Sequence, residues 1–308
     1  MMKRALIIGS GGQDGTLLSK LLTNRKYDVI GIKRNDLDVL NIQKVVECIG
    51  DIKPTEIYYL AAFHHSSDTL PPSSAEIFHR SMDLHFHAPV NFLDAITQSC
   101  RLIKFFFASS SHIFGPSENG MHTEKTPFTP ESEYSISKVA GMRACQYYRI
   151  NKNIFASTGI LYNHESPLRK TSFLSKKIAV AVANIYKNKQ GSLELADLDA
   201  ETDWGDARDT VEAIHHILQL NNAGDYIVST GKLHSVRDFV ETAFNYVGLN
   251  YLDYVVTKKI DGFRKSTRRL GSFSKLNHES GWKPSIDFKT MVSNLVQHEI
   301  NLIKENEL

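Results

Sequence analysis

The sequence predicts an α/β fold in which a parallel sheet is covered by helices on both faces and is joined to a smaller mixed α/β domain. Three observations lead to this prediction. Strand-like and helix-like patterns alternate through the first half, a glycine-rich turn follows the first strand, and 308 residues exceed what one small core requires.

The first half supports this prediction element by element. Residues 5–9 form a short apolar run that ends in glycine, and residues 16–22 carry apolar side chains at helical spacing. Residues 103–108 form a strongly apolar run, which is typical of a strand buried on both faces. The other segments expected in this half are strands at 27–32 and 56–61 and helices at 42–49 and 78–95.

The second half is less regular, although both patterns return. The expected elements are strands at 155–161 and 226–229 and helices at 211–220 and 236–247. Residues 163–203 are polar, and the chain after residue 262 is basic and rich in turn residues. We therefore expect one domain formed by residues 1–163 and 206–232 and a smaller domain formed by residues 164–205 and 233–308.

Composition and charge exclude several classes of function. The formal net charge of +2 leaves no basic surface for nucleic acid and no polybasic arm for a membrane. The three cysteines, Cys48, Cys100 and Cys145, show neither metal-binding nor disulfide spacing, which is typical of a reducing compartment. The N-terminal apolar run is too short for a signal peptide or a membrane span. We therefore expect a cytoplasmic protein that binds neither nucleic acid nor membrane.

Histidines gather near the expected strand ends, but we expect no metal site among them. His85 and His87 are two positions apart, so a helix points them to different faces. No carboxylate or thiolate completes a ligand set with them.

The glycine-rich turn carries the first functional signal. Gly9 permits a tight turn, Gly12 lets the backbone approach a pyrophosphate, and Gly15 allows the next helix to pack closely on the strand. Between a strand and a helix, this spacing predicts a Rossmann-type doubly wound, dinucleotide-binding domain rather than a turn with a structural role alone. The residues expected at the cofactor are Gly9, Gly11, Gly12, Gln13, Asp14 and Gly15.

The end of the second expected strand indicates which cofactor is bound. An acidic residue there would bind the ribose 2′-hydroxyl of NAD, whereas Arg34 suits the 2′-phosphate of NADP. The alternative is that Arg34 is a solvated surface charge. Asp36 and Leu37 follow closely and are expected to line the adenine pocket. We therefore expect NADP as the cofactor.

Tyr134 and Lys138 are four residues apart and share one face of an expected helix. A lysine charge beside a phenol favours the phenolate and lowers its pKa from about 10 toward neutrality. Such a tyrosine can take the proton from a sugar hydroxyl as hydride leaves. The spacing alone is common, but with the glycine turn and the serines at 109–111 it predicts a catalytic site.

Longer motifs resemble one family, the GDP-mannose 4,6-dehydratase branch of the extended short-chain dehydrogenase/reductases. The turn GSGGQDG is similar to the family's GITGQDG, and STGILYNHESPLR at 157–169 is similar to NGILFNHESPRR. The segments SEYSISKVAGMRACQYYR, LADLDAETDWGDARDTVEA and TGKLHSVRDFVETAF also resemble family motifs. The likeness covers nearly the whole chain.

This resemblance implies roles at matching positions. Tyr134 would be the catalytic phenol, Lys138 would bind the ribose and tune that phenol, and Ser110 would replace the family's catalytic threonine. Further cofactor contacts would come from Arg34, Leu60, Ala61, Ala62, His164 and Arg169.

The resemblance also implies a nucleotide-linked sugar as substrate, with a GDP-sugar as the first choice. Asn163 and Arg264 would lie on the sugar-nucleotide side, and His64 would lie along the substrate because it follows the cofactor stretch. Glu201 and Thr202 replace the Lys-Arg pair of the family's AKRDWG, and the family's RPTEVD is altered after its arginine. The nucleobase and the sugar therefore stay open.

Another departure from the family concerns the chemistry. The family motif STSELYG reads SSSHIFG here, so the glutamate that handles the proton at carbon 5 is replaced by His112. Imidazole has an intrinsic pKa of about 6.5 and can act as a general base near neutrality. Two interpretations stay open: His112 does the work of the glutamate, or it only fills the pocket and dehydration is lost.

Two further departures concern assembly and phosphate binding. The arginine- and serine-rich loop that helps to join the family's subunits into a tetramer is missing after Arg34, so a homodimer is expected and a tetramer is the alternative. Arg268 and Arg269 either neutralise a diphosphate or are solvated charges.

The leading expectation is a 4,6-dehydratase of deoxysugar biosynthesis, which oxidises carbon 4 of a GDP-hexose or GDP-heptose and then eliminates water across carbons 5 and 6. The alternative is an enzyme of the same fold that stops at hydride chemistry, as a 4-epimerase, 4-dehydrogenase or 4-keto reductase. A non-catalytic NADP-binding module is the third interpretation, and the retained Tyr134–Lys138 pair argues against it.

Overall fold

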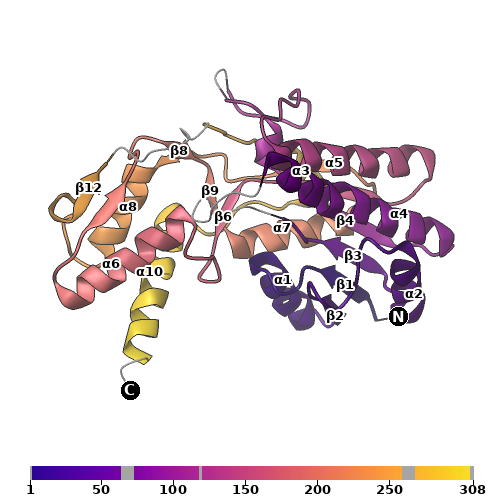
Figure 1. The fold of residues 1–308 in the computed structure, drawn as a ribbon, viewed down its shortest axis with the longest axis horizontal. Coiled ribbons are helices and arrows are strands. Elements are labelled where there is room, and N and C mark those ends of the chain that lie inside the picture. The colour runs from indigo at the N-terminus through magenta and orange to yellow at the C-terminus, as the bar shows by residue number, and fades with distance from the viewer. Residues whose placement is uncertain (1, 64–72, 118–119, 259–267, 306–308) are drawn as a thin grey trace.

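A six-stranded parallel sheet forms the centre of the structure, a computed structural model that describes residues 2–63, 73–117, 120–258 and 268–305 (Figure 1). In the order in which they lie side by side, the strands are β10 (Asp225–Val228), β5 (Ala156–Leu161), β4 (Lys104–Ser110), β3 (Glu56–Tyr59), β1 (Arg4–Ile8) and β2 (Asp28–Ile32). Because all pairs are parallel, the strands begin at one edge, here called the amino edge, and end at the other, the carboxyl edge.

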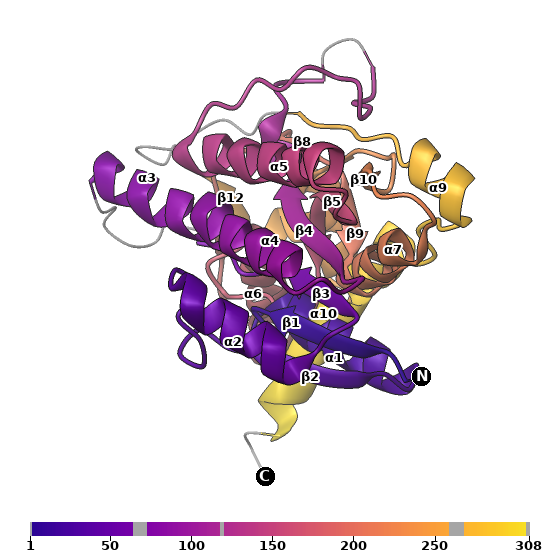
Figure 2. The same cartoon turned by 90° about the vertical axis from the view of Figure 1, so that its right-hand side faces the viewer.

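Helices cover both faces of the sheet, which confirms the predicted α/β fold (Figure 2). The helices are α1 (Gln13–Asn24) and α7 (Ala207–Gln219) on one face, and α2 (Ile42–Ile52), α4 (Ala88–Gln98) and α5 (Glu133–Asn151) on the other. Alternate strand residues point to opposite faces: Leu6 and Ile8 pack toward α2 and α4, whereas Ile7 packs toward α1 and α7. The middle of each of these strands is therefore mostly apolar, and charged residues such as Glu56 and Lys104 stand where strands begin.

The helix expected at 78–95 differs from the prediction. A five-residue π-helical turn, η1 (Asp83–His87), separates α3 (Ser74–Met82) from α4. Helix α5 crosses this turn so closely that a Cβ at Gly141 would lie 2.0 Å from the His85 carbonyl oxygen. Only glycine fits at this contact.

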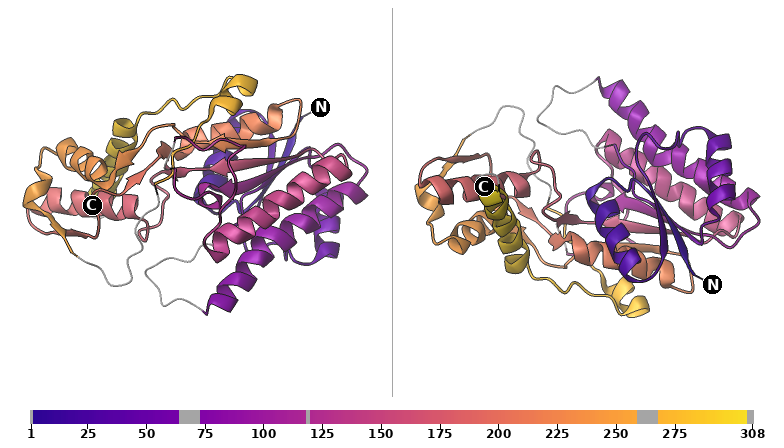
Figure 3. Two further views of the ribbon diagram at one scale, coloured as in Figure 1. Left: turned by 90° about the horizontal axis from the view of Figure 1, so that it is seen from above. Right: turned by 90° about the horizontal axis from the view of Figure 1, so that it is seen from below.

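A second hydrophobic core lies beside the sheet (Figure 3). Its helices are α6 (Leu174–Asn188), α8 (Val236–Tyr246) and α10 (Phe288–Glu305), which pack with the strand pair β7 (Leu193–Leu195) and β12 (Val255–Thr257). The residues of the range 233–308, expected in the smaller domain, do not all pack in the second core. Within it, Leu276 of α9 (Ser274–Ser280) and Trp282 pack in the core between the sheet and α7. None of the helices in the described ranges combines the length and the apolar character needed to span a bilayer.

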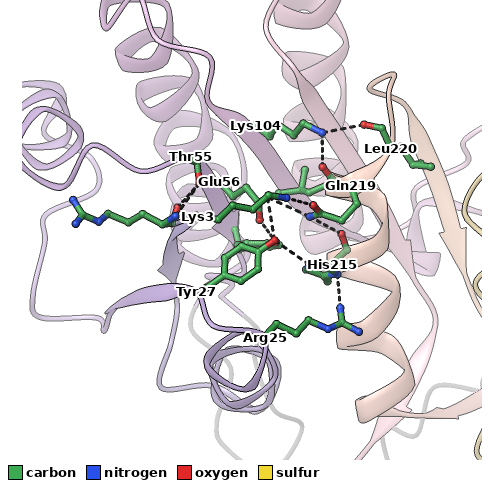
Figure 4. Close-up of polar contacts among 12 residues, drawn as sticks. Lys3, Arg25, Tyr27, Thr55, Glu56, Lys104, His215, Gln219 and Leu220 are labelled. Carbon is green, nitrogen blue, oxygen red and sulfur yellow. Dashed lines mark hydrogen bonds and ion pairs between the residues drawn. The ribbon is translucent and has the colours of Figure 1, made fainter. Parts of the chain in front are cut away.

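The amino edge of the sheet is closed by a polar cluster around Glu56, which is 2% exposed (Figure 4). Its carboxylate accepts hydrogen bonds from the Tyr58 hydroxyl at 2.6 Å and the Gln219 amide at 3.2 Å, and it pairs with Lys3 at 3.2 Å. The Tyr27 hydroxyl lies 3.3 Å from the same carboxylate. One carboxylate thus joins β3, the starts of β1 and β2, and α7.

The same cluster holds the end of α7. His215 contacts the Tyr27 hydroxyl at 3.1 Å and the Arg25 guanidinium, and burial together with the Arg25 charge lowers the His215 pKa to about 3. Lys104 donates to the carbonyl oxygens of Leu218 at 2.7 Å and Leu220 at 3.0 Å, where a positive charge complements the helix C-terminus.

Candidate active site at the carboxyl edge of the sheet

The glycine turn that follows β1 has little room for side chains. Gly9 has φ of +91°, and a Cβ there would lie 2.8 Å from the Ala61 backbone nitrogen. A Cβ at Gly15 would lie 2.4 Å from the Gly9 carbonyl oxygen, so α1 packs against the turn only because this residue is glycine. The contact with Ala61 also brings the predicted cofactor stretch Leu60–Ala62 beside the turn, and Leu60 N–H donates to the Ile8 carbonyl at 2.9 Å.

Gly12 caps the N-terminus of α1 and has open space on its outer side. The atom nearest to a Cβ placed there is the Gly9 carbonyl oxygen, at 3.5 Å. Bare backbone at a helix N-terminus with unpaired N–H groups favours an anion such as a pyrophosphate. The turn therefore fits the predicted dinucleotide.

The end of β2 lies against the same turn. Gly9 N–H and Ser10 N–H both donate to the Ile32 carbonyl, at 2.9 and 3.1 Å. Arg34 is exposed beside this contact, and the Lys33 side chain lies over Gly11, where its Cγ would be 3.7 Å from a Cβ at that position. Sequence reasoning assigned no role at the cofactor to Lys33, although it is the neighbour of Arg34.

The two residues expected at the adenine pocket have identifiable contacts in the protein. The Asp36 carboxylate accepts from Lys33 N–H at 2.7 Å and thereby closes its own turn. Leu37 packs against the core between the sheet and α2. Their contact with adenine stays a prediction.

His164 and Asp14 join the glycine turn to β6 (Asn163–Glu165), which follows β5. His164 Nε2 lies 3.0 Å from both Asp14 carboxylate oxygens, and His164 Nδ1 lies 2.7 Å from the Tyr162 carbonyl oxygen. Both nitrogens face acceptors, so the imidazolium is favoured. Burial opposes charge on either residue, but the pair outweighs it and raises the His164 pKa while lowering the Asp14 pKa.

Gln13 and Arg169 lie around this pair. Gln13 donates to the His164 carbonyl at 3.1 Å and accepts from the Ser166 hydroxyl at 2.8 Å. Arg169 pairs with Glu165 at 3.2 Å. The fold thus gathers Gln13, Asp14, His164 and Arg169 at one end of the glycine turn, as the sequence predicted for a cofactor-binding group.

Tyr134 and Lys138 lie on α5 at the carboxyl end of β4. Lys138 is 2% exposed, and its Nζ donates to the Ala108 carbonyl at 2.8 Å and lies 5.6 Å from the centre of the Tyr134 ring. Burial lowers the Lys138 pKa to about 7. Burial also raises the Tyr134 pKa to about 12, against a hydrogen bond with Ser110 that lowers it.

This pKa differs from the sequence expectation that Lys138 brings the phenol toward neutrality. The lysine points to the Ala108 carbonyl rather than to the phenol oxygen, and desolvation outweighs the groups that favour the phenolate. The geometry of the pair is as predicted, but the predicted pKa is wrong for this structure.

His112 lies close to Tyr134 and comes from the segment that follows β4. Ser110 and the short helix η2 (Ser111–Ile113) end β4, and His112 N–H donates to the Ser110 hydroxyl at 3.3 Å. The exposed His112 ring lies edge-on to the Tyr134 ring with 6.1 Å between centres. A phenol, a hydroxyl and an imidazole therefore border one space, while the buried Ser109 hydroxyl has no hydrogen-bond partner among the described residues.

The predicted substrate residues are only partly described. Asn163 is half-buried on β6, where it pairs with Trp204 of β9 (Trp204–Asp206) at the carboxyl edge. His64 and Arg264 lie outside the described residues. Arg268 pairs with Glu201 at 3.0 Å and Arg269 donates to the Phe114 carbonyl at 3.0 Å, so both basic residues contact the protein itself.

Comparison with known proteins agrees with this geometry. Residues 35–295 match the family described as GDP-mannose 4,6 dehydratase. The GDP-mannose 4,6 dehydratase of Drosophila melanogaster is 33% identical over 99% of this chain and 88% of its own length. RMD from Pseudomonas aeruginosa, solved with NADPH, superposes with a TM-score of 0.84 at 21% identity, covering 98% of this chain and 99% of its own. The dTDP-glucose 4,6-dehydratase of Bacillus anthracis, solved with NAD, gives 0.80 at 20% identity over 99% and 97%.

Proposed function

Because the chain belongs to the GDP-mannose 4,6-dehydratase family, we propose that it removes water from a nucleotide-linked sugar after oxidation at carbon 4. The proposed substrate is a GDP-hexose or GDP-heptose. The observation that carries this proposal is the meeting of Tyr134, Ser110 and His112 around one space beside the glycine turn.

The proposed cofactor is a nicotinamide dinucleotide, and NADP is preferred over NAD. The open backbone at Gly12 would hold the pyrophosphate, and Arg34 and Lys33 are the cations nearest to the turn at the end of β2. A nicotinamide held there would supply a hydride acceptor for carbon 4 and, once reduced, a hydride donor. The protein supplies position and proton transfer.

Proton removal from the carbon 4 hydroxyl is the task of Tyr134. The phenol oxygen must accept this proton as the carbonyl forms, so groups that favour the phenolate are required. Ser110 supplies a hydrogen bond to Tyr134, and Lys138 supplies a positive charge when protonated. Both act against the burial that raises the Tyr134 pKa.

Elimination needs a second proton carrier, and we assign it to His112. The carbon 4 ketone makes the carbon 5 proton acidic, His112 removes it, and the protonated His112 then donates a proton to the hydroxyl at carbon 6, which leaves as water. The exposed imidazole lies 6.1 Å from the Tyr134 ring, centre to centre, so the two side chains are close enough to act on neighbouring carbons of one sugar ring. No further base is required for the balance of protons.

The second candidate function is a 4-epimerase, 4-dehydrogenase or 4-keto reductase. One observation favours it: a histidine stands where the resemblance implies a glutamate. A non-catalytic NADP-binding module is disfavoured because Tyr134 and Lys138 are both present on one face of α5.

Incubation of the protein with NADP and GDP-mannose in heavy water, followed by mass spectrometry, separates the two candidates. We expect a product that has lost water and gained deuterium from the solvent. His112→Gln should block elimination while carbon 4 oxidation continues, and the matched variant His112→Glu should restore it. A product that is oxidised or epimerised at carbon 4 and retains the carbon 6 hydroxyl would reject the dehydratase in favour of the second candidate.

The proposed assembly is a homodimer, with a tetramer as the alternative. Helix α5 exposes Tyr147 and Ile150, at 53% and 78%, on its outward surface. Apolar side chains in such positions are suited to a partner helix. Light scattering of the protein, with and without the substitution Ile150→Glu, tests this assembly.

A further inference from the structure

A buried histidine links the cofactor stretch after β3 to the catalytic helix. We propose that His85, in the π-helical turn η1, is a positioning residue that fixes Tyr134 relative to the cofactor-binding segment Leu60–Phe63. The inference rests on the proposed function, because it assigns to Tyr134 the role of proton acceptor. The sequence alone indicates no role for His85, since its spacing from His87 argues against a shared metal.

The link is a chain of three hydrogen bonds. Phe63 N–H lies 3.0 Å from His85 Nε2, and His85 Nδ1 lies 2.8 Å from the Ser137 hydroxyl oxygen. The Ser137 hydroxyl donates to the Tyr134 carbonyl oxygen at 2.8 Å. The chain therefore runs from the backbone after β3 to the first turn of α5.

In each of these three hydrogen bonds, the group that donates the proton can be assigned. A backbone amide can only donate, so His85 Nε2 must accept and the ring proton must reside on Nδ1. Ser137 uses its own proton on the Tyr134 carbonyl, so its oxygen is free to accept from Nδ1–H. A neutral imidazole with this tautomer satisfies every group, and a side chain lacking one of the two nitrogens breaks the chain.

Packing holds the ring in place. His85 and Ser137 are both 0% exposed, and the His85 ring lies edge-on to the Tyr134 ring with 5.2 Å between centres. The π-helical turn and the absence of a Cβ at Gly141 allow α5 to approach this closely. His87, two positions later, is exposed. The contacts described for it are Asp83, at 3.3 Å, and the ring of Phe86.

Loss of the link should change the chemical step more than substrate binding. Tyr134 and the cofactor stretch belong to different elements, and hydride and proton transfer from one sugar carbon require both to be aligned. A displacement of about 1 Å in such a site costs about 100-fold in rate. The hydrogen bonds of His85 go to Phe63 and Ser137, and its ring packs on the edge of the Tyr134 ring, so we expect its loss to shift these groups while the sugar nucleotide still binds.

The test uses a double-mutant cycle in the full chain. His85→Phe keeps an aromatic ring and removes both hydrogen bonds, and Ser137→Ala removes the middle of the chain with a smaller change. We expect kcat to fall about 10- to 100-fold in each, KM for the sugar nucleotide to stay within about threefold, and the double variant to be little worse than either alone. His87→Phe, the same change at an exposed position, should retain full kcat.

Cofactor affinity gives a readout that is independent of sugar turnover. NADPH fluorescence should report a dissociation constant raised about three- to tenfold in His85→Phe, because Phe63 loses its anchor. If the unmodified protein turns over no sugar nucleotide, the proposed function fails, and the NADPH titration still decides the role of His85. Unchanged kcat and unchanged NADPH affinity in both single variants would overturn the inference. Losses of kcat that accompany losses of thermal stability in each single variant, and that add in the double variant, would also overturn it.

Discussion

Both the amino edge and the carboxyl edge of the central sheet are rich in polar side chains, but the two edges differ in how completely these side chains are hydrogen-bonded. At the amino edge, Glu56 is surrounded by donors from Lys3, Tyr58 and Gln219 (Figure 4). At the carboxyl edge, the buried Ser109 hydroxyl lacks a partner in the described part of the chain, and the buried Lys138 ammonium faces one carbonyl.

The contrast shows how a structural cluster and a reactive one can be told apart. Complete hydrogen bonding stabilises a buried charge, so the amino edge holds α7 to the sheet. At the carboxyl edge the hydrogen bonding is incomplete, and burial lowers the pKa of Lys138 and raises the pKa of Tyr134. The difference between the edges lies in the hydrogen bonding and not in the pKa shifts, because the His215 pKa at the amino edge is also lowered, to about 3. Substitutions at the two edges should therefore have opposite consequences for stability and for activity.

The largest expected effect is at the carboxyl edge. Tyr134→Phe should lower the rate of carbon 4 oxidation by about 10²- to 10⁴-fold, because the proton acceptor is removed. Thermal stability and NADPH binding should stay nearly unchanged, whereas Lys138→Ala should weaken both rate and binding. Single-turnover absorbance at the reduced nicotinamide band measures the rate. A Tyr134→Phe variant with most of its activity would show that another residue accepts the proton.

The converse experiment is at the amino edge. Glu56→Gln should lower the free energy of unfolding by about 1–3 kcal/mol, because buried donors lose a charged acceptor. Turnover per folded molecule should not change. Urea unfolding followed by circular dichroism provides the measurement, and Glu212→Gln, which breaks a partly exposed pair with Arg25, is the matched control with a loss below about 1 kcal/mol. Equal losses in both variants would remove the distinction between the clusters.

Cofactor preference tests the exposed cations of the carboxyl edge. The unmodified protein should bind NADPH more tightly than NADH, and Arg34→Ala should reduce that preference about 10-fold, since hydrogen bonds to charged groups contribute about 1.5–3 kcal/mol. Lys33→Ala should have a smaller effect because the Lys33 stem lies over Gly11. Isothermal titration with both cofactors gives the ratio. Equal affinities in the unmodified protein are the contrary result.

The smallest expected effect concerns the ion pair of His164 with Asp14 at the carboxyl edge. The ordinary pKa values are 6.5 and 3.8, and the folded protein raises the first and lowers the second. The stabilisation is therefore fully present between these two values and is lost as pH rises through the raised His164 pKa. Asp14→Asn should cost about 1 kcal/mol near pH 5 and progressively less above pH 7. Unfolding curves across this range check it, and a cost that grows with pH would contradict the assigned charges.

Much of this architecture could be predicted because its signals are local. Apolar periodicity located the sheet strands, and the glycine spacing located a turn where Gly9 and Gly15 have no room for a Cβ. The Tyr134–Lys138 spacing likewise follows from one helix. The positive φ of Gly9, the contact of Gly15 with Gly9 and the Tyr134–Lys138 spacing depend on residues a few positions away, whereas the contact of Gly9 with Ala61 does not.

The features that could not be predicted depend on contacts between distant segments. The π-helical turn at His85 carries no compositional signal of its own, since it is set by the approach of α5 at Gly141. The Glu56 cluster joins Lys3 to Gln219, and no spacing within the chain relates these positions. The Tyr134 pKa depends on burial, which a four-residue spacing does not contain.

The path of the chain between the two cores also determines what a ribosome would expose during synthesis. Strand β10 pairs with the outer side of β5. The ribosome synthesises the elements α6 to β9 and then α7 after β5 and before β10. At about 5–20 residues per second, the interval between Leu161 and Asp225 lasts about 3–13 s, and the edge of β5 has no partner during that time. The second core is completed later still, because α10 contributes Met291, Val292 and Leu295 to it. A nascent chain stalled in this interval would offer an unpaired strand to chaperones and to other nascent chains.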